Sequence, residues 1–174
     1  RERSILQEEF GIEDGWPVFC ENYIQWVLED HFPLGRPELE AVGVTFVPDV
    51  TPYEHMKLRI LNAGHASIAY VGALLDQYFV HEAMAHPLIY RYLEKMETEE
   101  ILPSVPPVPN TDLQAYLQLI LERFANPKIG DTIARLCFDG SNRQPKFVLP
   151  STRDRLQAGA SVTGLALESA LWCR

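Results

Sequence analysis

The stretch TPYEHMKLRILNAGHASIAYVGALL, residues 51–75, decides the fold class of this chain of 174 residues. Its apolar residues recur at the spacing of a buried helix face. Thr51 is a suitable N-cap, and Pro52 fits the first turn, where a missing backbone N–H costs little. We therefore predict one long helix from Thr51 to about Leu75, with the rest of the domain packed around it.

Outside this helix the pattern remains mainly helical. Residues 103–109 carry several prolines, which favour an extended connector, and residues 110–112 then offer N-cap chemistry. A strand is predicted at Val42 to Val47, where apolar residues alternate with others. Further helices are predicted at residues 18–32, 87–96, 112–124, 129–138 and 162–172, the last with Ser161 as its N-cap. The sequence thus predicts one mainly α, multi-helical domain over residues 1–174, with at most a short strand pair.

Composition and charge exclude several classes of protein. A composition of 47% hydrophobic and 22% charged residues is typical of a globular domain. The net charge of -9 argues against nucleic acid as a partner, since phosphate binding needs clustered lysine and arginine. No apolar run approaches the roughly 18 residues of a membrane span, which predicts no membrane partner. Three separated cysteines are typical of reduced thiols and predict a cytoplasmic protein. Because the first residue is arginine, a processed chain and a piece of a longer protein both remain open.

Three polar side chains share one half of the long helix. With about 100° per residue and Lys57 at zero, His65 lies at ~80° and Asn62 at ~140°. A neutral lysine can take the proton of a secondary alcohol as hydride leaves, and an amide and an imidazole can donate hydrogen bonds to the developing oxyanion. Positive charge from a protonated His65 or from arginines would lower the lysine pKa, whereas Glu54 would oppose that shift. The same spacing also fits a solvated lysine, a surface asparagine and a buried histidine.

The histidines outside this helix do not predict a metal site. His81-Glu82 and His86 have one residue too many between them for the His-Glu-x-x-His pair. On a helix the two imidazoles would point about 140° apart. We therefore predict no metal.

Several separated motifs, in order from Trp16 to Pro150, resemble those of one family. Lys57, Asn62 and His65 reproduce its Lys-x4-Asn-x2-His signature. The segment before it also resembles the family, at Trp16-Pro17, Glu21, Gln25 to Asp30, Phe32, Gly43-Val44, Phe46-Val47 and Asp49-Val50. A later segment does so at Arg135, Asp139-Gly140-Ser141 and Pro145-Lys146-Phe147. The chain therefore resembles the polyol-specific long-chain dehydrogenases, a family that includes mannitol 2-dehydrogenase and the fructuronate and tagaturonate reductases.

The resemblance implies the C-terminal substrate domain of an NAD(P)-dependent oxidoreductase, a multi-helical domain of the 6-phosphogluconate-dehydrogenase-like type. Such an enzyme interconverts a secondary alcohol and a ketone at C2 of a mannitol-type sugar alcohol. Lys57 would be the general base, or the acid in ketone reduction, and Glu54 would relay its proton. Asn62 and His65 would polarise and hold the oxygen.

Substrate binding is implied at two arginines. Arg135 would bind substrate hydroxyls or a sugar carboxylate. Arg143 stands where the family has a lysine. Because a planar guanidinium is not equivalent to an ammonium, the identity of the substrate stays open here. Together the two arginines could grip a carboxylate, so a fructuronate- or tagaturonate-type sugar acid is the alternative to a polyol. A non-catalytic helical interaction module is the third hypothesis.

The resemblance also implies a cofactor and a partner domain. No strand, Gly-x-Gly-x-x-Gly turn and helix follow one another, so the Rossmann domain that binds NAD or NADP in this family is absent from it. The resemblance therefore implies an N-terminal nucleotide-binding domain of the same protein as the partner. It also implies that the isolated domain is inactive.

Overall fold

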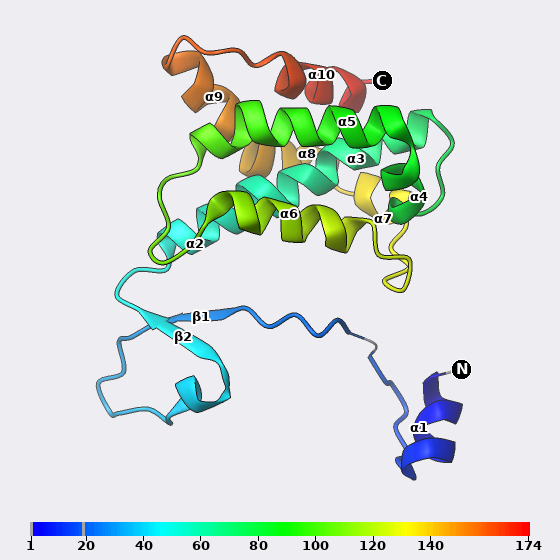
Figure 1. The fold of residues 1–174 in the computed structure, drawn as a ribbon, viewed down its shortest axis with the longest axis vertical. Helices are drawn as coiled ribbons and strands as arrows, with labels where there is room; N and C mark the ends of the chain where they lie inside the picture. The colour runs from blue at the N-terminus through cyan, green and yellow to red at the C-terminus, as the bar shows by residue number, and fades with distance from the viewer. Residues whose placement is uncertain (1, 19) are drawn as a thin grey trace.

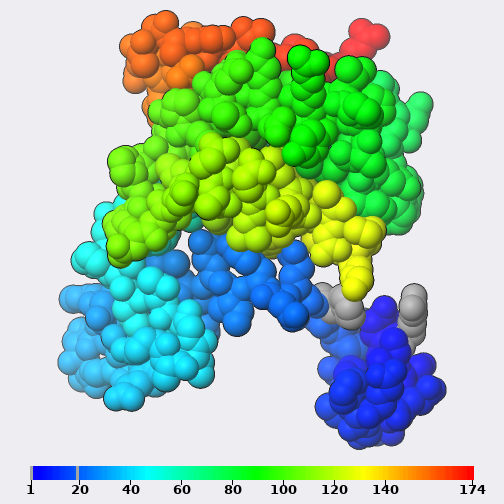
Figure 2. All heavy atoms as spheres, viewed as in Figure 1, coloured from blue at the N-terminus to red at the C-terminus, as the bar shows by residue number. Residues whose placement is uncertain are grey.

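The computed structural model describes residues 2–18 and 20–174. Its helical body begins at Thr51 and is built around α3, which contacts α5, α7 and α10 (Figure 1). The strands and α1 lie apart from this body, at the N-terminal end of the chain (Figure 2). In chain order the elements, with η for 3-10 and π helices, are α1 (Glu2–Phe10), β1 (Trp26–Glu29), η1 (Leu39–Val42), β2 (Val44–Val47), α2 (Thr51–Met56), η2 (Lys57–Asn62), α3 (Ala63–Leu74), α4 (Val80–Ala85), α5 (Pro87–Met96), η3 (Glu97–Ile101), η4 (Leu102–Ser104), α6 (Leu113–Phe124), α7 (Ile133–Cys137), α8 (Gly140–Arg143), η5 (Gln144–Val148), α9 (Leu149–Gln157) and α10 (Thr163–Trp172).

The predicted long helix is confirmed, since α2, η2 and α3 follow one another without a break from Thr51 to Leu74. Two details differ from the prediction. The N-cap is Val50, and the backbone N–H of Thr51 donates to the Asp49 carboxylate at 2.9 Å. The middle of the rod, η2, is a π-helix rather than an α-helix.

The prediction of a helix at residues 18–32 is wrong. Within that range Trp26–Glu29 forms a strand, and Phe19 lies outside the described residues. A short apolar run cannot be assigned from its period alone, and backbone pairing with a second strand decides this one.

The two strands form a parallel pair, in which Trp26 lies opposite Val44 and Glu29 opposite Val47. The strand predicted at Val42 to Val47 is therefore confirmed from Val44 onward. Val42 instead ends η1, and Gly43, at φ 92°, turns the chain into β2. Large apolar side chains of the N-terminal segment that contains the pair are exposed, among them Trp16, Ile24, Trp26, Leu34 and Val42.

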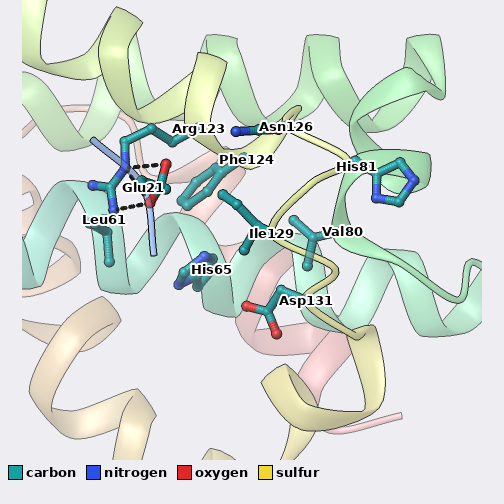
Figure 3. A pocket seen from close by; sticks show the side chains of 10 residues that line it. All are labelled: Glu21, Leu61, His65, Val80, His81, Arg123, Phe124, Asn126, Ile129 and Asp131. Atoms are coloured by element: carbon teal, nitrogen blue, oxygen red, sulfur yellow. Dashed lines mark hydrogen bonds and ion pairs between the residues drawn. The ribbon is translucent and has the colours of Figure 1, made fainter. Parts of the chain in front are cut away.

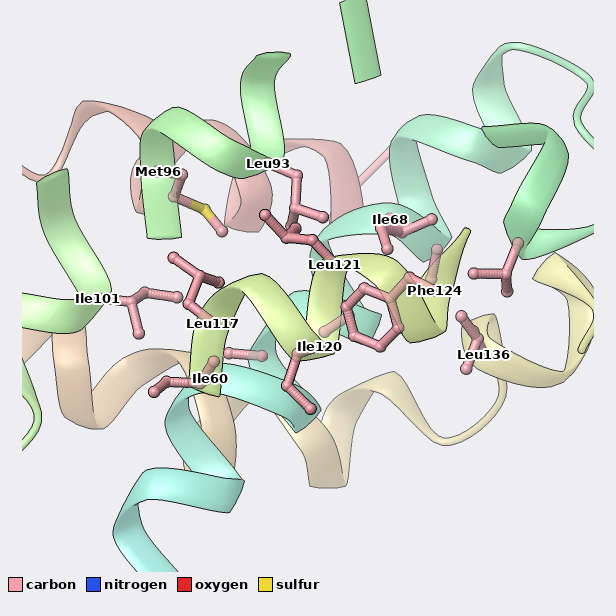
Figure 4. Packing of buried hydrophobic residues seen from close by; sticks show 14 of the residues in the cluster. Ile60, Ile68, Leu93, Met96, Ile101, Leu117, Ile120, Leu121, Phe124 and Leu136 are labelled. Carbon is pink, nitrogen blue, oxygen red and sulfur yellow. The ribbon is translucent and has the colours of Figure 1, made fainter. Parts of the chain in front are cut away.

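The hydrophobic core fills the space between η2, α3, α5 and α6 (Figure 4). Ile68 of α3, Leu93 of α5 and Leu117 of α6 are fully buried there. The predicted cap of α6 is confirmed, because the Asp112 carboxylate accepts the backbone N–H groups of the first turn at 2.9 and 3.1 Å. The mainly α architecture with a short strand pair is as predicted.

The remaining helix predictions hold to different degrees. The helix at 87–96 is confirmed as α5, and that at 162–172 as α10, although its N-cap is Val162 and not Ser161. The helix predicted at 129–138 is confined to Ile133–Cys137, because Gly130 adopts φ 64° and ends any earlier turn.

Residues 140–157 are helical although no helix is predicted there. Pro145 and Pro150 lie in the first turns of η5 and α9, where proline is tolerated because its missing N–H would be unpaired in any case. This segment folds back over the long helix, since η5 packs against η2 and α3.

Arg59 ties the π-helical turn to the C-terminal half of the domain. Its buried guanidinium donates to the Ser104 carbonyl and to the Asp154 carboxylate. We expect Arg59→Met to lower the free energy of unfolding by about 2–4 kcal/mol, because the carbonyl and carboxylate lose a charged partner. Urea unfolding measures this loss. The control Lys95→Met breaks only an exposed pair with Glu99 and should change stability by less than about 0.5 kcal/mol.

Candidate active site

Lys57, Asn62 and His65 open onto one pocket of about 400 Å³ beside the long helix. The first two come from η2 and the third from α3. The segment from α7 to η5 supplies the other lining residues, which are Arg135, Asp139, Asn142, Arg143, Lys146 and Phe147. Five of the six predicted site residues therefore share this pocket. The sixth, Glu54, is exposed on α2 and does not line it.

The π-helical turn explains how Lys57 and Asn62 face the same pocket. On an α-helix, residues five apart would point about 140° from each other. A π-helix bonds residue i to residue i+5, which brings these two side chains back into line. Two further π-helical segments, Glu97–Ile101 and Gln144–Val148, pack against this turn. Such turns are frequent at functional sites.

His65 is held as a neutral imidazole. Its ring packs on Phe124, with ring centroids 4.3 Å apart and planes inclined by 30°. Burial lowers the pKa of His65 to about 4; Asp131 opposes this shift, and nearby arginines, Arg135 among them, reinforce it. Near neutral pH His65 therefore adds no positive charge to the site, whereas Arg135, Arg143 and Lys146 line it. A neutral imidazole keeps one N–H with which to donate a hydrogen bond.

Both predicted substrate-binding arginines are partly engaged within the protein. Arg135 donates through Nε and Nη2 to the two carboxylate oxygens of Asp131, four residues earlier. Arg143 donates through Nη1 to the Leu136 carbonyl oxygen at 2.9 Å. These contacts fix both guanidinium groups at the wall of the pocket and use part of their hydrogen-bonding capacity.

A second, smaller pocket of about 80 Å³ also borders His65 (Figure 3). Phe124 and Asp131 line it together with the imidazole. At its edge the Glu21 carboxylate accepts two hydrogen bonds from Arg123 Nε and one from Nη2, at 2.8 to 3.1 Å. This ion pair joins the N-terminal segment to α6, so the segment before the strands helps to enclose the histidine.

Sequence reasoning assigns no role to four residues that line the larger pocket, namely Asp139, Asn142, Lys146 and Phe147. Asp139 has a left-handed backbone at φ 64°, and its carboxylate accepts from Asn142 Nδ2 at 2.6 Å. The ion pair of Asp131 with Arg135 was also missed, although a spacing of four residues on a helix is a signal for it.

No group of three or more histidine, cysteine, aspartate or glutamate residues within 2–18 and 20–174 could hold a metal ion. Cys20, Cys137 and Cys173 are free thiols. In the same described ranges, no helix combines the length and the apolar character needed to cross a membrane.

Two curated proteins show how far the likeness extends. Mannitol 2-dehydrogenase of Cereibacter sphaeroides is 63% identical over 173 residues, which cover 99% of this chain and 36% of that protein. Mannitol dehydrogenase DSF1 of Saccharomyces cerevisiae is 46% identical over 157 residues, which cover 90% and 31%. The chain thus spans about a third of the length of these relatives.

Solved structures agree with the sequence relatives. Pseudomonas fluorescens mannitol 2-dehydrogenase, in a ternary complex with NAD and D-mannitol, matches with a TM-score of 0.88 and 44% identity, over 98% of this chain and 35% of that one. Substrate-free D-sorbitol dehydrogenase matches with a TM-score of 0.90 and 30% identity, over 97% and 35%. The family profile "Mannitol dehydrogenase C-terminal domain" matches residues 49–174. The chain belongs to the mannitol dehydrogenase C-terminal domain family.

Proposed function

We propose that the chain is the substrate-binding and catalytic domain of an NAD(P)-dependent dehydrogenase, which interconverts a secondary alcohol and a ketone at C2 of a mannitol-type sugar alcohol. The meeting of Lys57, Asn62 and His65 at one open pocket carries this proposal. An amine, an amide and a neutral imidazole can together remove a hydroxyl proton and hold the oxygen that remains. The mannitol 2-dehydrogenases similar to this chain support the substrate class.

In the direction of oxidation, the Lys57 amine takes the proton of the C2 hydroxyl as the C2 hydrogen leaves with its electron pair. Asn62 and His65 donate hydrogen bonds to the oxygen as negative charge builds on it. The amine accepts the proton through its free electron pair. Glu54, exposed one turn before Lys57, passes the proton on to solvent. In ketone reduction the same groups act in reverse.

A nicotinamide cofactor, NAD or NADP, supplies the acceptor for the hydride. The pocket fits only the nicotinamide end of such a cofactor. The described residues contain no Gly-x-Gly-x-x-Gly turn between a strand and a helix that could hold its pyrophosphate. Cofactor binding therefore belongs mainly to an N-terminal nucleotide-binding domain of the same protein. No metal takes part in the proposed reaction.

That partner domain would cover the N-terminal part of this chain. Trp16 and Val18 are each 86% exposed there, and Leu34 is fully exposed. Parallel strands are normally covered on both faces and extended by further strands, so the β1–β2 pair fits the edge of a larger sheet. The relatives are about three times as long as this chain and so include enough further residues to form one.

The arginines favour a polyol over a sugar acid as the substrate. A two-point grip on a carboxylate requires a free pair of N–H groups on one guanidinium. Arg135 already gives such a pair to Asp131, and Arg143 gives one Nη to a backbone carbonyl. The sugar acid remains the second candidate, because Arg135, Arg143 and Lys146 bring several positive charges to one pocket.

We also propose a cytoplasmic location, supported by the three free thiols, which fit a reducing compartment. The alternative is a non-catalytic interaction module. It does not explain why an amine, an amide and an imidazole line one pocket, because packing alone does not require them there.

The complete enzyme is expected to reduce NAD or NADP in the presence of D-mannitol and to form the 2-ketose, whereas residues 1–174 alone should not turn over. Mixing this domain with a separately made nucleotide domain should restore activity. Rates with mannitol, arabinitol, mannonate and altronate identify the substrate class. Preference for the two acids would replace the polyol by a sugar acid, and a complete enzyme inert toward all four substrates would refute the proposal.

A further inference from the structure

A buried carboxyl group lies directly behind the wall of the pocket. Glu168 of α10 has no exposed surface, and its Oε1 accepts a hydrogen bond of 2.6 Å from Gln144 Nε2. Its Oε2 accepts from the Ser169 hydroxyl at 3.2 Å. Gln144 is itself only 3% exposed and directly follows Arg143, which lines the pocket. The pair thus connects the C-terminal helix to the backbone that carries Arg143.

The same segment is packed closely against α3 and α10 on its inner side. A Cβ atom at Gly140 would lie 2.7 Å from Tyr70 Oη and 2.5 Å from Trp172 Nε1, so only glycine fits this approach. The Tyr70 hydroxyl and Gln144 Oε1 are buried beside the pair and have no partner in hydrogen-bond geometry. Behind the pocket wall, the 2.6 Å hydrogen bond from Gln144 Nε2 to Glu168 Oε1 therefore fixes the Gln144 side chain.

We propose that Glu168 is a positioning residue, which holds Gln144 and thereby keeps residues 139–147, with Arg143 among them, in the orientation that binds the substrate. It acts through Gln144 and does not touch the substrate. The proposal rests on the proposed dehydrogenase function for its kinetic consequences, but the structural link can be tested without activity.

The charge of Glu168 changes near neutral pH. Burial raises its pKa to about 7, although the hydrogen bonds from Gln144 and Ser169 oppose the shift. The titratable groups facing it are Tyr70 of α3 and Tyr92 of α5, and burial raises the pKa of both, so they stay neutral at that pH. Because an ionised acceptor makes the stronger hydrogen bond, the link should tighten as pH rises through 7.

Kinetics of the complete enzyme test the proposal. Glu168→Met should raise KM for the polyol about ten-fold with little change in kcat, because the segment loses its anchor. Glu168→Gln keeps an acceptor and should restore KM to within about two-fold of wild type. It should also remove the fall of KM with rising pH near 7 that the wild-type enzyme should show. Unchanged KM in Glu168→Met would overturn the proposal.

Glu100, in η3, provides a matched control because it contacts the same helix, α10. Its carboxylate accepts the backbone N–H groups of Gly164 and Leu165 at 2.8 and 2.9 Å, so Glu100→Met should loosen the start of α10 without reaching the pocket wall. We expect a lower melting temperature and unchanged KM. An equal rise of KM in Glu100→Met would mean that general loosening of α10, and not the link to Gln144, is responsible.

Hydrogen exchange separates this proposal from the proposed function. Glu168→Met should speed exchange of the backbone amides of residues 139–147, and Gln144→Met should do the same by removing the donor of the same bond. Glu100→Met should not. If the wild-type enzyme oxidised no polyol but these exchange rates changed as described, the function would fail and the anchoring role would stand. Unchanged exchange in both Glu168→Met and Gln144→Met would refute the anchoring role.

Discussion

Lys57→Ala should lower kcat for polyol oxidation by about 10²–10⁴-fold, the usual contribution of a general base, while KM changes little. The pocket retains Asn62, His65 and the arginines, so the substrate still binds. What is lost is the amine that we propose takes the hydroxyl proton. Steady-state kinetics over a range of pH measure the effect, and an added small primary amine should restore part of the rate by entering the vacated space.

Lys95→Ala is the matched control for this variant. It removes a lysine from α5 that is exposed and pairs weakly with Glu99 at 3.9 Å. Its kinetics should be those of the wild-type enzyme. Near-normal turnover by Lys57→Ala across the pH range would show that another group takes the proton.

Asn62→Asp should reduce kcat by about 10²–10³-fold, the loss found when one donor to an oxyanion is removed. Aspartate has nearly the shape of asparagine but carries acceptors only, so it repels the negative oxygen that the amide would stabilise. Hydride transfer should become slower while the fold is kept. Single-turnover rates of cofactor reduction report this step directly.

Asn126→Asp tests whether the effect depends on position. The Asn126 side chain uses its oxygen to accept the backbone N–H of Lys128 at 3.0 Å, an interaction that aspartate keeps. Turnover should therefore remain within about two-fold of wild type. An Asn62→Asp enzyme as active as this control would exclude an oxyanion-holding role for the amide.

Local signals in the sequence were sufficient where a single interaction determines the structure. Asp112 caps α6 as predicted, because its carboxylate satisfies N–H groups two and three residues away. Pro87 begins α5 for the same kind of local reason. The family signature of Lys57, Asn62 and His65 led to the pocket, since its members are close in the chain and lie on one continuous rod.

Features set by distant parts of the chain were not predictable in this way. The strand at Trp26–Glu29 exists because Val44–Val47 pairs with it, and nothing within residues 18–32 encodes that partner. The neutral state of His65 arises mainly from burial, which depends on packing against Phe124 of α6. The anchoring of Gln144 by Glu168 joins residues 24 positions apart through a buried contact.

The π turn at Lys57–Asn62 also makes the proposed active site sensitive to chain length at this point. Loss of one amino acid here would let the turn relax into ordinary α geometry, with every backbone bond still made. The amine would then swing by about 100° relative to His65. Such a deletion would leave helix content almost unchanged but would remove the proposed base from the pocket. Among related sequences, a single gap in this turn should therefore mark a change of chemistry rather than a loss of fold.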